Sequence, residues 1–282
     1  MDKIKRRDFL KLALLAIAGG VSVAGGYLYN NDESSQLVVE RVLIPIKNLN
    51  PSLEGFTIAQ LSDIHLGGWT QPDLAQRAVA LTNSLNPDLI VLTGDYVWHK
   101  VESIFELAPI LADLDARYGV YAAMGNHEIW TDVKVINQAF HEIRMPVLVN
   151  QGVTISAGGE NLYLAGLDDG WSGQPDLKTA LDSAPTNAPI ILLFHEPDLA
   201  DRVSVDSRIS LQLAGHSHGG QIRFPLIGAP LLPFLSWKYD QGLYRVRDMW
   251  LYTNRGIGVT NIPIRYRCTP EITLLTLVQA SY

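Results

Sequence analysis

The chain has 282 residues, of which 47% are hydrophobic and 18% charged, so it can bury a sizeable core and is not intrinsically disordered. Its formal net charge is −7, and because the first 31 residues hold five basic and two acidic side chains, the remainder carries −10. So acidic a body is a poor electrostatic match for nucleic acid, and no nucleic-acid partner is expected.

The N-terminal 36 residues are predicted to form a unit separate from a single domain at 37–282. They contain Arg6-Arg7 followed by Asp8-Phe9-Leu10-Lys11. This run resembles the twin-arginine export signal, and the resemblance implies a partner, the twin-arginine export machinery, and an extracytoplasmic location.

An uncharged apolar stretch, residues 12–29, follows this motif. Small residues at 22–24 would allow signal cleavage. The stretch is also close to the length of a membrane span, so retention as an anchor in the cell envelope stays open. An amphipathic first helix of the fold is the weaker alternative. A polar linker, residues 30–36, leads into the domain.

Strand-like and helix-like segments alternate through the domain. Helical spacing of apolar residues predicts helices over 72–85, 104–114 and 133–143. Apolar and β-branched runs predict strands over 38–46, 56–61, 89–93, 120–123, 147–149, 153–156, 162–167, 190–194 and 209–213. A strand-rich last third (242–247, 250–254 and 273–278) suggests a second sheet packed on the first.

Five short polar motifs each follow an apolar run. They read L-S-D-I-H-L-G, L-T-G-D-Y, M-G-N-H-E, L-L-F-H-E-P-D and A-G-H-S-H-G-G-Q. Continuous apolar runs such as Leu89–Leu92 indicate strands covered by helices on both faces, and sites in such sheets collect at the carboxyl ends of the strands. Side chains at i and i+2 point the same way, so Asp63 and His65, or His216 and His218, can bind one ion together.

The repeated oxygen and imidazole donors indicate a two-metal hydrolytic centre. The single cysteine, Cys268, lies outside the motifs, so the metal ligands are hard or borderline donors rather than thiolates.

The series D-x-H, G-D, G-N-H-E, H and G-H-x-H resembles the calcineurin-like metallophosphoesterases over roughly residues 56–277. The variants F-H-E-P-D, N-R-G-I-G-V and C-T-P-E-I-T-L-L look like the bacterial exported and membrane-associated branch, which includes UDP-2,3-diacylglucosamine hydrolases of lipid A synthesis. The resemblance implies an α/β fold of the four-layer αββα sandwich type. It also implies hydrolysis of a phosphodiester or pyrophosphate by a metal-bridging hydroxide.

The resemblance carries specific roles onto this sequence. The first metal would take Asp63, His65 and His218, the second Asn126, His195 and His216, and Asp95 would bridge both. His127 would stabilise or protonate the leaving oxygen, or instead only orient Asn126. Two divalent ions are implied as cofactors; Mn²⁺ is expected, with Fe or Zn²⁺ as alternatives.

One motif departs from the serine/threonine protein phosphatases of this superfamily, which continue as G-D-Y-V-D-R-G. Here the segment reads G-D-Y-V-W-H-K, without the arginine that grips phosphate in those enzymes, so protein phosphatase activity is not expected. His99 would either replace part of the function of that arginine or be an exposed loop histidine. Asp168 and Asp169 would orient a metal-binding histidine or accept backbone hydrogen bonds in a turn.

Five of the six tryptophans are predicted to lie in loops around the site, namely Trp69, Trp98, Trp130, Trp171 and Trp237. The apolar, proline-rich loop 224–237 favours a ligand groove or membrane contact. We therefore expect a site that faces the bilayer and a lipid-linked or nucleotide-sugar-lipid phosphate ester as substrate. The alternatives are loops packed together as a lid, soluble nucleotides or small esters as substrates, and a non-catalytic metal-binding envelope protein.

Overall fold

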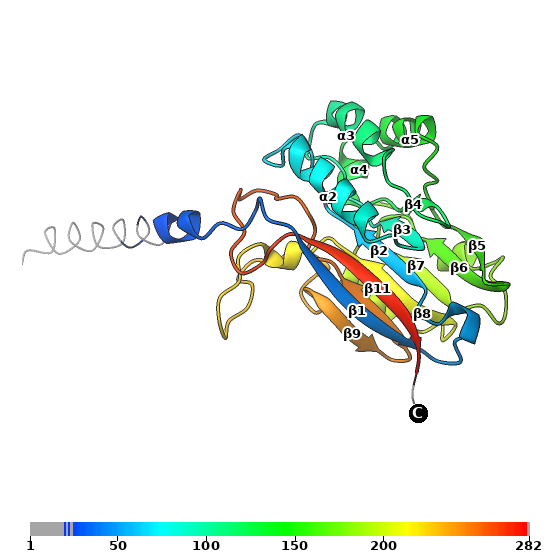
Figure 1. Ribbon diagram of the computed structural model, residues 1–282. Coiled ribbons are helices and arrows are strands. Elements are labelled where there is room, and N and C mark those ends of the chain that lie inside the picture. The colour runs from blue at the N-terminus through cyan, green and yellow to red at the C-terminus, as the bar shows by residue number, and fades with distance from the viewer. Residues whose placement is uncertain (1–19, 21, 23–24, 281–282) are drawn as a thin grey trace, which may run out of the picture.

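The computed structural model describes residues 20, 22 and 25–280 (Figure 1). The predicted twin-arginine motif lies outside the described residues, as does most of the apolar stretch. No helix within the described part of the chain combines the length and apolarity needed to cross a bilayer.

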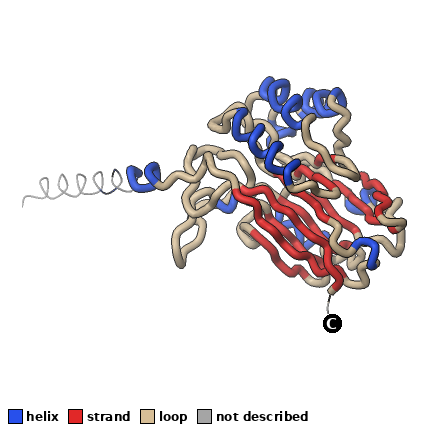
Figure 2. The backbone as a smooth tube through the Cα atoms, viewed as in Figure 1, coloured by secondary structure: helices blue, strands red, loops and turns tan. Residues whose placement is uncertain are grey.

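Two sheets form the centre of the molecule (Figure 2). The first has the order β1-β11-β2-β3-β4, and its strands in that order are Val38–Ile46, Glu271–Gln279, Thr57–Leu61, Leu89–Leu92 and Val120–Ala122. The second has the order β5-β6-β7-β8-β10-β9, with strands Gln151–Ala157, Glu160–Gly166, Ile190–Leu193, Ile209–Ala214, Met249–Thr253 and Gly242–Val246.

Helices lie on the outer faces of both sheets (Figures 1 and 2). The first sheet is covered by α2 (Pro72–Ser84), α3 (Ile104–Leu111) and α5 (Val133–Glu142). The second is covered by the short helices α6 (Leu177–Ala180) and α7 (Ala200–Val203). The remaining helical turns are α4 (Asn126–Trp130), η1 (Pro51–Leu53), η2 (Val101–Ser103), η3 (Pro197–Leu199) and η4 (His218–Gly220).

Three buried clusters separate four layers. One joins the helices to the first sheet through residues such as Ile90 and Phe140, and another joins the two sheets through Val91 and Leu193. The third lies beneath α6 and α7. Neighbours in β3 such as Ile90 and Val91 reach different clusters because side chains alternate along a strand. The predicted αββα sandwich is confirmed.

Three sequence-based expectations about the strands were wrong. Residues 147–149 form no strand, only an isolated bridge between Ala122 and Val147. The C-terminal strand β11 inserts between β1 and β2 of the first sheet instead of joining the second. The second sheet already begins with β5, so it is not confined to the last third of the chain. The apolar content of a segment indicates that it forms a strand, but it does not determine which strands it pairs with.

The polar linker is bound to the domain. The Glu33 carboxylate accepts hydrogen bonds from Cys268 N (3.0 Å) and Thr269 Oγ1 (2.8 Å), and Asp32 Oδ1 accepts one from Arg265 N (2.9 Å). These contacts hold the N-terminal segment against the loop that precedes β11 (Figure 1).

Candidate metal centre

The five polar motifs meet at one place. They follow β2, β3 and β4 of the first sheet and β7 and β8 of the second, and strands within each group are parallel. Five of the predicted ligands have φ between 49° and 68°, namely Asp63, His65, Asp95, His216 and His218. Residues other than glycine rarely adopt this backbone conformation, and residues strained in this way are typically concentrated at functional sites.

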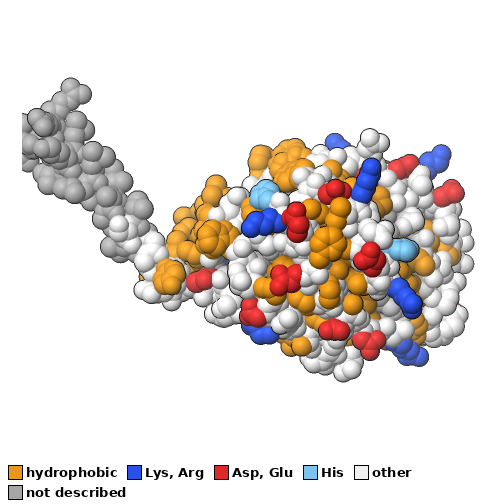
Figure 3. Space-filling view, turned by 90° about the horizontal axis from the view of Figure 1, so that it is seen from above, with side chains coloured by type: hydrophobic (Ala, Val, Ile, Leu, Met, Phe, Trp, Pro, Cys, Tyr) orange, Lys and Arg blue, Asp and Glu red, His pale blue; other side chains and the backbone are white. Residues whose placement is uncertain are grey.

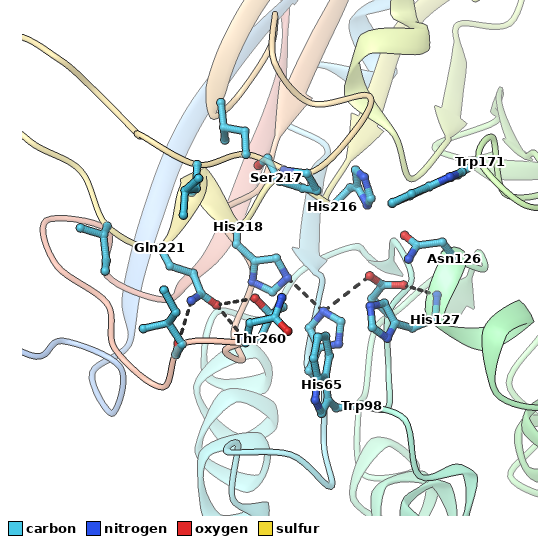
Figure 4. Close-up of a pocket in the computed structure, with 18 of the residues that line it drawn as sticks. His65, Trp98, Asn126, His127, Trp171, His216, Ser217, His218, Gln221 and Thr260 are labelled. Atoms are coloured by element: carbon cyan, nitrogen blue, oxygen red, sulfur yellow. Dashed lines mark hydrogen bonds and ion pairs between the residues drawn. The ribbon is translucent and has the colours of Figure 1, made fainter.

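One cluster joins Asp63, His65 and His218, all of them buried. The two Nε2 atoms of the histidines are 3.0 Å apart (Figure 4), and His218 Nε2 lies 3.2 Å from Asp63 Oδ1. Two imidazole nitrogens and a carboxylate oxygen thus converge within hydrogen-bond distance of one another, and imidazole and carboxylate groups together form a donor set of the kind that binds divalent cations.

A second cluster joins Asp95, His195 and His216. His195 Nε2 lies 3.2 Å from Asp95 Oδ2, and the same carboxylate oxygen lies 3.5 Å from His65 Nε2 of the first cluster. Asp95 therefore lies between the two clusters, where a bridging ligand would have to be.

Three buried polar atoms in or beside the second cluster make no hydrogen bond within the described chain, namely Asn126 Oδ1, His216 Nδ1 and His195 Nε2, although the last lies 3.2 Å from Asp95 Oδ2. The other ring nitrogens are held by backbone carbonyls, His195 Nδ1 by Thr93 O (2.5 Å) and His216 Nε2 by Phe234 O (2.7 Å). Because a carbonyl only accepts, those nitrogens carry the protons and the unpaired ones offer lone pairs. Buried unpaired acceptors are costly, so this donor set fits divalent cations.

The protonation states agree with this assignment at two of three histidines. Burial lowers the pKa of His65 well below its usual value, and burial together with His195 lowers the pKa of His216 to about 4. Burial also opposes the charged form of His195, but Asp95 and Asp63 raise its pKa overall. Because a cation bound there would repel that proton, metal binding would release His195 Nε2 as a ligand.

Close packing at the centre requires glycine at two positions. A Cβ atom on Gly125 would lie 2.4 Å from Asp95 Oδ1 and 2.8 Å from His195 Nε2. One on Gly215 would lie 2.2 Å from Asp63 Oδ2. All three contacts are far inside van der Waals distance, so any larger residue would displace a candidate ligand.

Glu128 supports the centre, although the sequence analysis gave it no role. Its carboxylate accepts hydrogen bonds from the backbone N–H groups of Asp95, Tyr96 and Gly125, each at 2.8 Å. Burial and the Asp95 charge nevertheless raise its pKa to about 8. Its position three residues after Gly125, which is the spacing of a capping box, is the one sequence feature that could have indicated this role.

Arg265 is a second supporting residue that the sequence analysis missed. It is fully buried, and its Nη2 donates to Arg255 O (2.8 Å) and Gly258 O (2.6 Å) and lies 3.3 Å from His218 Nδ1. No motif in the sequence distinguished this arginine from a surface residue, because its partners are backbone carbonyls.

His127 lies beside the first cluster. Its backbone N–H donates to Asp95 Oδ1 (2.9 Å), and its ring stacks on Trp98 with centroids 4.6 Å apart. Burial lowers the pKa of its imidazole. Among the described residues no hydrogen bond joins His127 to Asn126, so the contacts do not favour the alternative in which it only orients that amide.

A pocket of about 460 Å³ adjoins the clusters (Figure 4). Three of the predicted tryptophans line it, Trp98, Trp130 and Trp171. Trp69 and Trp237 do not, and they are 58% and 68% exposed. The remaining apolar lining comes from Ile222, Ile262 and residues 230–233.

Three further polar residues, His99, Asp168 and Asp169, lie outside the two clusters. His99 is exposed and lines the pocket. The Asp169 carboxylate accepts hydrogen bonds from the N–H groups of residues 171–173, and the Asp168 carboxylate accepts from Asp169 N and Gln174 N. These contacts match the turn interpretation of the two aspartates.

Comparison with known proteins gives an independent result. A family model described as calcineurin-like phosphoesterase matches residues 56–220. The chain is 34% identical over 293 residues to the uncharacterized metallophosphoesterase YkuE of Bacillus subtilis, covering 98% of this chain and 99% of that protein. It is 32% identical over 280 residues to phosphodiesterase YaeI of Escherichia coli, covering 98% and 100%.

Among solved structures, the sulfate thiohydrolase SoxB of Thermus thermophilus matches with a TM-score of 0.51 at 12% identity. The match covers 82% of this chain and 57% of SoxB. At this identity the similarity concerns the fold.

Proposed function

The chain belongs to the calcineurin-like phosphoesterase family and is a metal-dependent phosphoester hydrolase, and from this premise we propose that it is a phosphodiesterase acting on an ester with a lipid or other apolar group. The observation that carries the proposal is the pocket beside the metal clusters, whose walls are largely tryptophan, leucine, isoleucine and proline. Ligand pockets of this kind take an apolar group, and a few polar residues fix its orientation.

The metal ions and the protein side chains would have different roles in hydrolysis. Two divalent ions, with Mn²⁺ as our expectation, would supply an activated water and polarise the phosphoryl group when bound. Asp63, Asp95, Asn126 and the candidate histidine ligands would hold those ions at the strand ends. We expect His127, kept neutral by its lowered pKa, to donate its ring N–H to the leaving oxygen.

The similarity to phosphodiesterase YaeI supports a diester as the substrate. An apolar pocket would equally accept a lipid-linked pyrophosphate of the kind that UDP-2,3-diacylglucosamine hydrolases cleave. The two substrates differ in charge: a phosphodiester is a monoanion, whereas a pyrophosphate carries at least one further negative charge.

We also propose that the enzyme is exported through the twin-arginine pathway and works outside the cytoplasm with its pocket facing a membrane. Leu226, Ile227 and Leu231 of the loop 224–237 are 108%, 77% and 71% exposed. Tyr266 contacts both this loop and the N-terminal segment, since its ring lies 6.1 Å from Phe224 and 5.8 Å from Tyr27. Hydrophobic side chains gather where that segment meets the domain (Figure 3). The predicted anchor and the exposed loop would thus reach one bilayer together.

The catalytic proposal is tested by hydrolysis of bis-p-nitrophenyl phosphate. We expect metal-stripped protein to be inactive, Mn²⁺ to restore hydrolysis, and Asp95→Asn to abolish it. Absence of hydrolysis with both ions demonstrably bound would contradict a general phosphodiesterase.

The membrane proposal is tested by liposome sedimentation. Replacing Leu226 and Ile227 with serine should weaken binding, whereas Val205→Ser, an equally exposed position (69%) before β8, should not. Equal binding by both variants would count against membrane contact through this loop.

A further inference from the structure

The lining of the pocket contains no lysine or arginine among the residues that the structure describes. Its ionisable side chains are the candidate ligands, His127 and His99. An enzyme that binds a doubly charged phosphate group usually offers it an arginine or lysine in addition to metal ions.

Three of the basic residues near the pocket are occupied elsewhere. Arg223 Nη1 lies 2.7 Å from Asp240 Oδ2 and donates to Gly219 O at 2.8 Å. Lys238 Nζ lies 2.6 Å from Asp201 Oδ2. Arg265 is buried behind His218, with its guanidinium on backbone carbonyls. These contacts give each cation its own partners outside the pocket.

The charge of the centre therefore sets what the pocket can hold. The candidate ligands include two carboxylates, Asp63 and Asp95, which would offset part of the charge of the two ions they would hold. Beyond those ions, the described lining offers a substrate no cationic lysine or arginine side chain. A dianionic monoester or a pyrophosphate would therefore place its additional negative charge against apolar walls, where burial is costly, whereas a monoanionic diester would not.

We propose that this pocket selects phosphoesters carrying a single negative charge and two uncharged arms, and that it discriminates against phosphomonoesters and pyrophosphates through the absence of a basic side chain. This inference rests on the proposed function and narrows its substrate to diesters.

The two arms have separate walls to contact. The Trp98 and Trp130 rings contact His127, and the Trp171 ring lies 4.8 Å from Trp130. Leu231, Leu232 and Ile262 supply an aliphatic surface. An aromatic or acyl arm gains affinity on either wall by losing contact with water.

The test uses two substrates that differ in charge and hardly in shape, p-nitrophenyl methylphosphonate and p-nitrophenyl phosphate. In both reactions water adds to phosphorus, the P–O bond to the aryl group breaks, and p-nitrophenol leaves. At pH 8 the first substrate is a monoanion and the second a dianion. We expect kcat/KM for the methylphosphonate to be higher by on the order of 100-fold. Equal values, or a preference for the phosphate, would overturn the inference.

A matched pair of variants tests whether the lack of a basic side chain causes this substrate preference. Asn261 is exposed and lines the pocket, so Asn261→Arg adds a cation without disturbing the core. It should raise the ratio of monoester to methylphosphonate kcat/KM about tenfold, and Asn261→Gln should leave it unchanged. No change with arginine would argue against charge selection.

Lys100 provides a further check, because it is exposed next to His99 and could reach the pocket if it moved. Lys100→Ala should leave the substrate ratio unchanged, and a change would show that the pocket does use a cation.

Binding gives a readout apart from turnover. Quenching of tryptophan fluorescence from the pocket walls by diphenyl phosphate should occur at lower concentration than quenching by phenyl phosphate, and the reverse order would contradict the proposal. Loss of metal-dependent hydrolysis of every substrate would instead defeat the proposed function, so the two failures are distinguishable.

Discussion

Replacing Glu128 with glutamine should destabilise the protein although the two side chains have the same shape. Glu128 is fully buried and accepts three backbone N–H bonds of 2.8 Å, with Oε2 serving Asp95 and Gly125 and Oε1 serving Tyr96. A glutamine can turn its single oxygen toward only one side, so its NH₂ group must face at least one N–H. A buried unsatisfied donor costs about 1–3 kcal/mol.

We expect Glu128→Gln to lower the free energy of unfolding by about 3 kcal/mol, from one orphaned backbone N–H and the buried amide group that faces it. Urea denaturation at pH 6 measures this change. Glu106→Gln, on the exposed surface of α3, is the control and should stay within about 0.5 kcal/mol of the wild type. A Glu128→Gln effect as small as the control's would refute the idea that this carboxyl holds together the segments that follow β3 and β4.

The pH dependence gives a second readout. In the metal-free protein the Glu128 pKa is raised from 4.5 to about 8, first by burial and then by Asp95. The folded state thus holds the proton more tightly than the unfolded chain, so the stabilisation is complete below pH 4.5 and is lost as pH rises toward 8. Glutamine does not titrate, so the stability difference between wild type and variant should narrow as pH rises over this window. A difference that widens would mean that the three N–H bonds outweigh burial.

Three other perturbations test the centre. Chelation of bound metal should lower the melting temperature by about 5–10 °C, and an unchanged value would contradict a tight metal site. His127→Ala should reduce kcat by about 10²- to 10⁴-fold with metal content unchanged; loss of metal would identify His127 as a ligand. Gly125→Ala places a Cβ 2.4 Å from Asp95 Oδ1 and should reduce both metal content and activity, whereas Gly26→Ala, with no atom within 4 Å of the added Cβ, should change neither.

Much of this protein could be predicted from its sequence because the relevant signals are local. The alternation and apolarity of runs such as Leu89–Leu92 identify buried strands, and a polar motif directly after such a run lies at a strand end. The motif residues Asp63, Asp95 and His195, each following a different strand, were therefore expected to lie close together, and their side chains do.

The supporting contacts were decided only by the tertiary structure. Glu128 contacts residues 32 and 33 positions earlier in the chain, Phe234 O fixes the His216 ring from a separate loop, and the linker carboxylate of Glu33 reaches Cys268 across 235 positions. No sequence pattern pairs these residues with one another, because one partner in each contact is a backbone carbonyl or N–H, a group that nearly every residue carries. The place of β11 between β1 and β2 is likewise a matter of pairing between distant strands, which the composition of a strand does not encode.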